Sequence, residues 1–174
     1  MTFSLIARDE ITGFYGIAVA SRFFAVGATI PHFGQNCAVA SQALVNPMWG
    51  VAGREHLSAG MSASEALNAT KLLDNGQSQR QVHMIDQRGR TAAHTGSDCI
   101  GWAGHLTADG VSVAGNMLEN DQVTAAMMRY YNHHKTVEFA SRILGAMHAG
   151  ESAGGDSRGR QSASLTIHRG ELFP

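Results

Sequence analysis

The sequence contains only two cysteines, Cys37 and Cys99, and neither lies in a CxxC or Cys/His spacing of the kind that zinc and redox sites use. We therefore expect both to be buried thiols. No apolar run approaches the roughly 20 residues that span a bilayer, and the chain opens without the basic and apolar regions of a signal peptide. These absences predict a cytoplasmic protein that does not associate with membranes.

Charge of either sign is not in excess, because thirteen Lys and Arg stand against fourteen Asp and Glu, for a formal net charge of −1. The chain has no basic stripe, so nucleic acid is not an expected partner and a small-molecule substrate fits better. Nine histidines are present, but they form no HExxH sequence and no two-His-one-carboxylate spacing. We therefore expect neither a metal nor another cofactor.

The length of 174 residues predicts one domain over residues 1–174 with a core of its own. Alternating apolar residues and turn signals predict strands over 3–8, 14–21, 25–31, 37–44, 81–85, 91–94, 111–116 and 163–169. Helical spacing predicts helices over 47–60, 62–75, 120–131 and 136–149, the first capped by Asn46 and the second by Ser62 with Glu65. This order predicts an α+β fold, a four-layer αββα sandwich of two antiparallel sheets covered by helices.

The segment from Gly154 to Ala163 combines three glycines with an acid, two arginines, an amide and two hydroxyls, directly before an apolar strand. Glycine allows positive φ and a close approach to a ligand, while Asp156, Arg158 and Arg160 can hold charge in a fixed geometry. We interpret the segment as part of a binding site. The alternative is a solvated glycine loop whose charges pair with one another.

Met1 is followed by Thr2, a small residue of the kind whose initiator methionine is normally removed. Removal leaves a free threonine, whose hydroxyl is a nucleophile and whose α-amine, with a reference pKa of about 8, is a general base. One residue then supplies two catalytic roles. The alternative is that the chain begins Met-Thr for no chemical reason.

Several short motifs occur in order along the chain: Thr2-Phe3-Ser4, Ala7-Arg8-Asp9, Ala18-Val19-Ala20-Ser21-Arg22, Gln42-Ala43-Leu44, Asn46-Pro47, His94-Thr95-Gly96, Trp102-Ala103-Gly104, Gly115-Asn116-Met117-Leu118, and Gly154-Gly155-Asp156 through Ser162. Together they resemble the domain-of-unknown-function-1028 family, which is grouped with the N-terminal-nucleophile (Ntn) hydrolases. The resemblance covers essentially the whole chain and implies the αββα sandwich of those enzymes. The family usually continues with another strand beyond Phe173-Pro174, where this sequence ends.

The resemblance also implies roles for individual residues. Thr2 would be the nucleophile, Arg22 would supply a positive field, Asn116 would donate to the oxyanion, and Asp156 and Ser162 would orient the α-amine. The residues expected to bind substrate are Gln42, Asn46, Arg160 and Gln161, with Arg160 holding a substrate carboxylate.

Each of these roles has a structural alternative. Arg22 can pair with Asp9 or Glu10, Asn116 can close a turn, and Asp156 can pair with Arg158 or Arg160.

The expected function is hydrolysis of a C–N amide bond in a small, carboxylate-bearing metabolite. Two other interpretations remain open: a catalytically silent module that binds a small ligand in the same cleft, and an assembly component whose sheet edge after Arg169 is completed by another chain. A homodimer is the expected assembly in each case.

Overall fold

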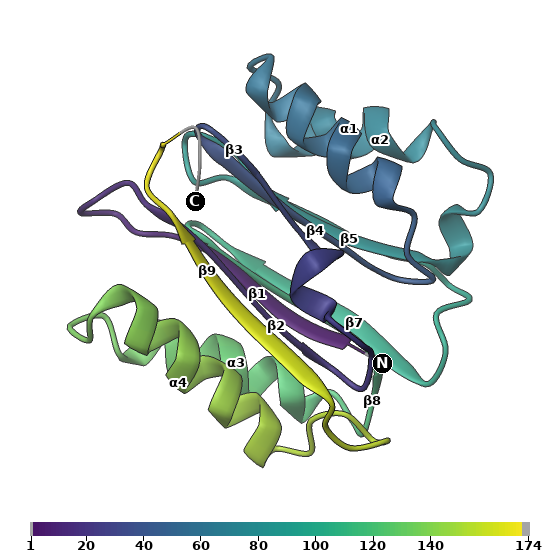
Figure 1. The fold of residues 1–174 in the computed structure, drawn as a ribbon, viewed down its shortest axis with the longest axis vertical. Helices are drawn as coiled ribbons and strands as arrows, with labels where there is room; N and C mark the ends of the chain where they lie inside the picture. Colours follow the sequence, from purple (N-terminus) through teal and green to yellow (C-terminus); the bar gives the residue numbers. More distant parts are fainter. Residues whose placement is uncertain (1, 172–174) are drawn as a thin grey trace.

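Two antiparallel sheets lie face to face in the computed structural model, which describes residues 2–171 (Figure 1). The five-stranded sheet has the order β7-β8-β1-β2-β9, formed by Trp102–Ala108, Val111–Leu118, Thr2–Arg8, Tyr15–Ser21 and Ser162–His168. The four-stranded sheet has the order β3-β4-β5-β6, formed by Pro31–Gly34, Cys37–Ala43, Arg80–Ile85 and Thr91–Thr95.

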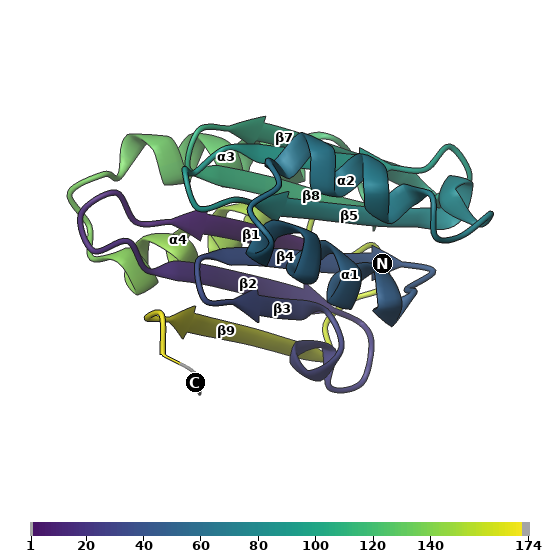
Figure 2. The ribbon, with the colours of Figure 1, turned by 90° about the horizontal axis from the view of Figure 1, so that it is seen from above.

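A helix pair covers the outer face of each sheet (Figures 1 and 2). The helices α1 (Pro47–Ser58) and α2 (Ala63–Lys71) pack on the four-stranded sheet, and α3 (Gln122–His133) and α4 (Phe139–Ser152) pack on the five-stranded sheet. The order of layers is therefore helix, sheet, sheet, helix. This arrangement confirms the predicted α+β sandwich.

Local signals set the starts of α1 and α2. The side chain of Asn46 accepts a hydrogen bond from the backbone N–H of Met48 at 3.0 Å, and Pro47 takes the first helical position. The hydroxyl of Ser62 accepts from the backbone N–H of Glu65 at 3.3 Å, and the Glu65 carboxylate accepts from the backbone N–H of Ser62 at 2.8 Å. Both predicted caps are confirmed.

Alternation along β1 divides its side chains between two layers. Phe3 and Leu5 belong to the apolar cluster beneath α3 and α4, whereas Ile6 belongs to the cluster between the two sheets. Ser4 also faces the other sheet, since its hydroxyl bonds to Gln42 of β4. The side chain of Thr2, two residues before Ser4, therefore points to the same space between the sheets.

One end of the sandwich, here called the Thr2 end, brings together residues that are distant in sequence. Thr2 begins β1 and pairs with Ser21 at the end of β2 and with Asn116 near the end of β8. In the opposite sheet, Ala43 at the end of β4 pairs with Arg80 at the start of β5. Ser4 lies two residues from Thr2 and contacts Gln42, so the two sheets meet across this end.

The strand predicted for 25–31 is wrong. A 3₁₀ turn occupies Val26–Ala28, and β3 begins only at Pro31. Ala25 adopts a left-handed conformation with φ 50°, and the backbone N–H of Val26 donates to the Ser162 hydroxyl at 3.1 Å, so the chain is turned away from an extended path.

The strand β7 was not predicted. Its side chains are partly or fully exposed at the edge of the sheet, so its apolar alternation is weak. The helix predicted over 136–149 is present but begins at Phe139 and ends at Ser152.

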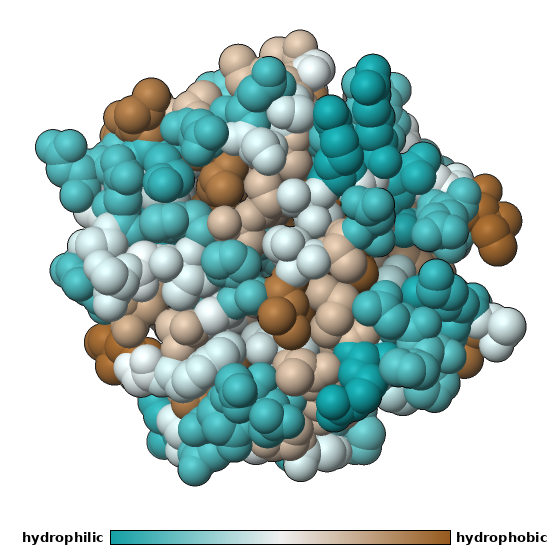
Figure 3. Space-filling view, turned by 180° about the vertical axis from the view of Figure 1, so that it is seen from behind, coloured by the Kyte–Doolittle hydropathy of each residue, from teal (hydrophilic) through white to brown (hydrophobic). Residues whose placement is uncertain are grey.

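The surface viewed from behind shows its most hydrophobic residues lying singly among hydrophilic ones (Figure 3), as is normal for a globular protein. Within residues 2–171, no helix is both long enough and apolar enough to cross a membrane.

Candidate functional site

Thr2 occupies a central, nearly buried position at the start of β1. Thr2 is only 8% exposed, and its Oγ1 donates a hydrogen bond to the Ser21 hydroxyl at 3.2 Å. Strand pairing places Asn116 on its other side. Thr2 is thus held between two neighbouring strands, with its hydroxyl oriented by the partner strand.

The loop after α4 reaches this same end of the sheet. An isolated bridge joins Asp156 to Leu118, the last residue of β8. The Asp156 carboxylate accepts a hydrogen bond from the backbone N–H of Arg22 at 2.8 Å, and Arg22 directly follows the Thr2 partner Ser21. Thr2 and Asp156 therefore lie at the same end of the sheet, with Ser21 and Arg22 between them.

Asp156 also makes the internal ion pair that was considered as its structural alternative. The guanidinium of Arg158 lies 3.3 Å from the carboxylate, and the backbone N–H of Arg158 donates to it at 2.9 Å. The side chain of Asp156 is only 3% exposed. The hydrogen bonds of Asp156 hold the loop after α4 against the backbone that follows β2.

Arg22 and Ser162 make other contacts than those expected. The Arg22 guanidinium is exposed and donates to the carbonyl of Arg158 at 2.7 Å. Ser162 donates to the carbonyl of Phe23 at 2.6 Å and accepts from Val26, so it anchors the loop after β2. Because β2 lies between β1 and β9, one whole strand separates Ser162 from Thr2.

Asn116 is buried and belongs to a hydrogen-bond network between the sheets. Its side-chain nitrogen donates to Oε1 of Gln81 at 2.9 Å, and that oxygen also accepts from Gln42 at 2.8 Å. The Gln81 nitrogen donates in turn to the carbonyl of Gly115 at 2.8 Å and to Thr95. Gln81 therefore joins both sheets beneath Thr2.

Sequence reasoning missed Gln81 altogether. In β5, Gln81 and His83 alternate with the apolar residues Val82 and Met84, and that alternation was the available signal. Gln42, expected to contact substrate, is fully buried in the same network.

The network continues inward through His83, which is fully buried between two serines. The hydroxyl of Ser4 donates to Gln42 at 2.7 Å, so Nε2 of His83, 2.8 Å away, donates to Ser4. Nδ1 then accepts from the Ser112 hydroxyl at 2.9 Å. Burial, with a smaller effect of His105, lowers the pKa of His83 to about 3, so the ring is neutral.

A pocket of about 320 Å³ opens at the Thr2 end. Its lining comes from both sheets, from the residues directly after β4 and directly before β5, and from the segment between β6 and β7: Ala43, Leu44, Gln79, Asp98, Cys99, Ile100, Asn116 and Met117. We call it the Asn116 pocket. Cys99, predicted to be buried, is partly exposed here, while Cys37 is buried as predicted.

Two residues of this pocket have a strained backbone. Ala43 has φ 71° and Met117 has φ 55°, values that non-glycine residues rarely adopt. Such conformations cost on the order of 1–3 kcal/mol each and cluster at functional sites. Their meeting in one pocket, one from each sheet, marks it as a candidate ligand site.

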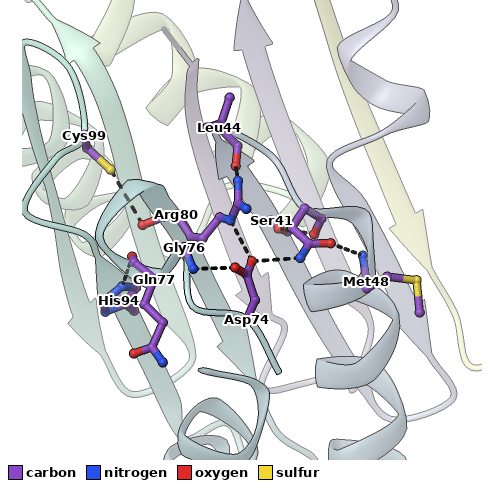
Figure 4. A network of polar contacts seen from close by, with 10 residues as sticks. Ser41, Leu44, Met48, Asp74, Gly76, Gln77, Arg80, His94 and Cys99 are labelled. Atoms are coloured by element: carbon purple, nitrogen blue, oxygen red, sulfur yellow. Dashed lines mark hydrogen bonds and ion pairs between the residues drawn. The ribbon is translucent and has the colours of Figure 1, made fainter. Parts of the chain in front are cut away.

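Asn46, which was expected to bind substrate, makes structural hydrogen bonds near this pocket. Besides capping α1, it donates to Asp74 at 2.8 Å, and Asp74 pairs with Nε of Arg80 at 2.8 Å. Figure 4 shows Arg80 between Asp74 and the carbonyl of Leu44. Hydrogen bonds from Arg80, Asn46 and the backbone of Gly76 lower the pKa of Asp74 to about 2.

Arg160 and Gln161 line a different pocket. This cavity of about 530 Å³ lies between α4 and the strands β2 and β9, on the helix-covered face that also carries Phe3. Arg160 pairs there with Glu151 of α4. The structure thus separates these two residues from the sheet face to which the Thr2 side chain points.

Among residues 2–171, no three His, Cys, Asp or Glu side chains are grouped closely enough to hold a metal ion.

No curated protein matches the chain. A solved structure of a DUF1028 protein from Silicibacter pomeroyi is similar, with 32% sequence identity and a TM-score of 0.89, over 95% of this chain and 72% of that one. The sequence model of one family, DUF1028, described as a family of unknown function, matches residues 2–173. The chain therefore belongs to the DUF1028 family.

Proposed function

We propose that this protein is an Ntn hydrolase that cleaves a C–N amide bond in a small molecule, with Thr2 as the nucleophile. The observation that carries the proposal is the convergence at the Thr2 end. A threonine hydroxyl oriented by Ser21 stands beside Asn116, which lines a pocket with a strained backbone. The four-layer sandwich is consistent with this class of enzyme.

In the proposed reaction, removal of Met1 frees the α-amine of Thr2. Met1 itself lies outside the described residues. The neutral amine takes the hydroxyl proton while Oγ1 attacks the amide carbonyl. The resulting ammonium then protonates the leaving nitrogen, the C–N bond breaks, and water hydrolyses the acyl ester to regenerate Thr2. No cofactor enters the balance.

Asn116 is the proposed donor to the oxyanion. Its side-chain nitrogen carries two hydrogens, and one of them is used on Gln81. The second is suited to the negative charge that develops on the attacked carbonyl oxygen, because the residue lines the pocket. Asp156 acts as a positioning residue, since it holds the backbone of Arg22 next to Ser21.

The test begins with the intact mass of the purified protein, which reports whether Met1 is removed. Amide-containing metabolites are then screened against the native protein and its Thr2→Ala and Thr2→Ser variants. We expect turnover by the native protein, retention of part of it in Thr2→Ser, and loss in Thr2→Ala. Turnover that is unchanged in Thr2→Ala would remove Thr2 from the mechanism.

A binding protein of the same fold is the second candidate, and the strained Asn116 pocket supports it equally. If Met1 is retained in the cellular protein, the nitrogen of Thr2 is an amide and the general base is lost. A protein with Met1 in place, no turnover and saturable ligand binding would favour this candidate.

Two predictions about partners stay open to test. The expected substrate carboxylate relied on Arg160, which here pairs with Glu151 in the other pocket. Completion of the sheet by another chain would involve β9, which forms an edge of the five-stranded sheet, whereas the expected homodimer is assigned to no particular surface. Size-exclusion chromatography with light scattering measures the oligomeric state directly.

A further inference from the structure

We propose that the Asn116 pocket takes a positively charged group, an ammonium or guanidinium, carried on a short apolar stem. If the pocket holds the substrate of a hydrolase, the inference rests on the proposed function. If the pocket only binds a ligand, the inference rests on the pocket's geometry alone.

The walls of the pocket offer apolar surface that is still exposed to solvent. Leu44 is 60% exposed and Ile100 is 69% exposed, and Met117 lies next to them in the lining. The backbone N–H of Met117 donates to the carbonyl of Ile100 at 2.9 Å, which holds these two walls together. An apolar stem of a ligand would cover this surface.

Asp98 is the one charged side chain among the eight residues that line the pocket. Its carboxylate accepts a hydrogen bond from the Ser97 hydroxyl at 3.2 Å, and within residues 2–171 it takes part in no ion pair. The backbone N–H of Asp98 donates to the carbonyl of Ser78 at 2.7 Å, which fixes the position of the residue. Asp98 thus offers a free negative charge at the pocket.

The neighbouring cation, Arg80, is already compensated. Its guanidinium bonds to Asp74 and to the carbonyl of Leu44, and its side chain is only 17% exposed (Figure 4). It therefore provides little attraction for a ligand carboxylate. The remaining polar side chains of the lining are the neutral amides of Gln79 and Asn116 and the thiol of Cys99, whose pKa is raised by burial. The net field in the pocket favours a cation.

The strained residues supply a second and independent sign of ligand binding. Ala43 and Met117 keep positive φ values in the lining of this one pocket, one at the end of β4 and the other in β8. Conformations of this kind persist where the surrounding structure enforces them, and they recur at ligand sites.

Binding is measured on the Thr2→Ala protein, so that no turnover occurs. Three probes with the same five-carbon stem are titrated, n-pentylamine, 1-pentanol and hexanoate, with the methyl NMR signals of Ile100 and Met117 as reporters. At pH 7 the amine is cationic and the acid anionic. Because an exposed ion pair contributes up to about 1 kcal/mol, we expect the amine to bind about fivefold more tightly than hexanoate.

Matched variants assign this preference to one carboxylate. Asp98→Asn should remove it and Asp98→Lys should reverse it, while Asp109→Asn, an exposed acid in the turn between β7 and β8, should leave it intact. Equal affinities, tighter binding of hexanoate, a preference that survives in Asp98→Asn, or no shift of the two methyl signals would each overturn the inference. Turnover that is unchanged in Thr2→Ala would contradict the proposed hydrolase alone, so the two failures are distinguishable.

Discussion

The carboxylate of Asp156 accepts a hydrogen bond from the backbone N–H of Arg22 at 2.8 Å, across 134 residues of sequence. This contact joins the loop after α4 to the end of β2, immediately beyond the strand partner of Thr2. The carboxylate is nearly buried and also pairs with Arg158. The loop, the end of β2 and the start of β1 are therefore held as one unit.

The first prediction concerns this contact. Asp156→Ala leaves the Arg22 N–H without its acceptor and should lower the free energy of unfolding by about 1–3 kcal/mol, measured by urea denaturation. Asp156→Asn keeps one acceptor oxygen and should cost less. The matched control is Asp109→Ala, in an exposed turn, which should change stability by less than about 0.5 kcal/mol. Equal losses in Asp156→Ala and the control would contradict the assigned role.

The second prediction concerns Gln81. Gln81→Ala removes hydrogen bonds to Gln42, Asn116 and the carbonyl of Gly115, and leaves buried polar groups unpaired. We expect a loss of about 3 kcal/mol in the free energy of unfolding and a lower rate of Thr2-dependent hydrolysis. Gln79→Ala, two residues earlier and exposed, serves as the control for stability. A stability like that of the control would show that the network contributes little.

The fold was predictable because its signals are local. The first hairpin, the cap at Asn46 and the capping box at Ser62 depend on residues within a few positions of one another, and the structure has all three. The prediction failed where a residue distant in sequence sets the path of the backbone. The path of 25–31 is set in part by Ser162, 136 residues away from Val26.

The candidate site was predictable only in part, for a related reason. Thr2 begins β1, Asn116 lies near the end of β8, and Asp156 lies in the glycine-rich loop after α4. The sequence marks all three positions, and the structure brings them to one end of the sandwich. The contacts of Gln81 depend on how the two sheets are aligned face to face. The contact of Arg160 depends on where α4 packs on its sheet. A single sequence carries no pattern for either.

The third prediction is a pH dependence of stability that arises from His83. Its pKa is about 3 in the folded protein and about 6.5 when unfolded, so the unfolded state binds one proton more between these values. Stability is therefore fully present above pH 6.5 and falls on acidification, by up to about 1.4 kcal/mol per pH unit. We expect His83→Gln, measured by urea denaturation from pH 7 to pH 4, to lose less stability than the native protein. Parallel curves for the two proteins would rule out this role.

The last prediction uses the strained backbone of the Asn116 pocket. Ala43 has φ 71°, where alanine costs about 1–2 kcal/mol and glycine does not, so Ala43→Gly relieves strain while it adds freedom to the unfolded chain. The two effects nearly cancel, and we expect a change within about 0.5 kcal/mol. Ala40→Gly, in the same strand but fully buried and outside the positive-φ region, should cost about 1.5 kcal/mol through lost burial and added freedom. Urea denaturation of both variants measures the difference. If both glycines cost the same, Ala43 stores no strain, and the argument that its conformation marks a ligand site loses its support.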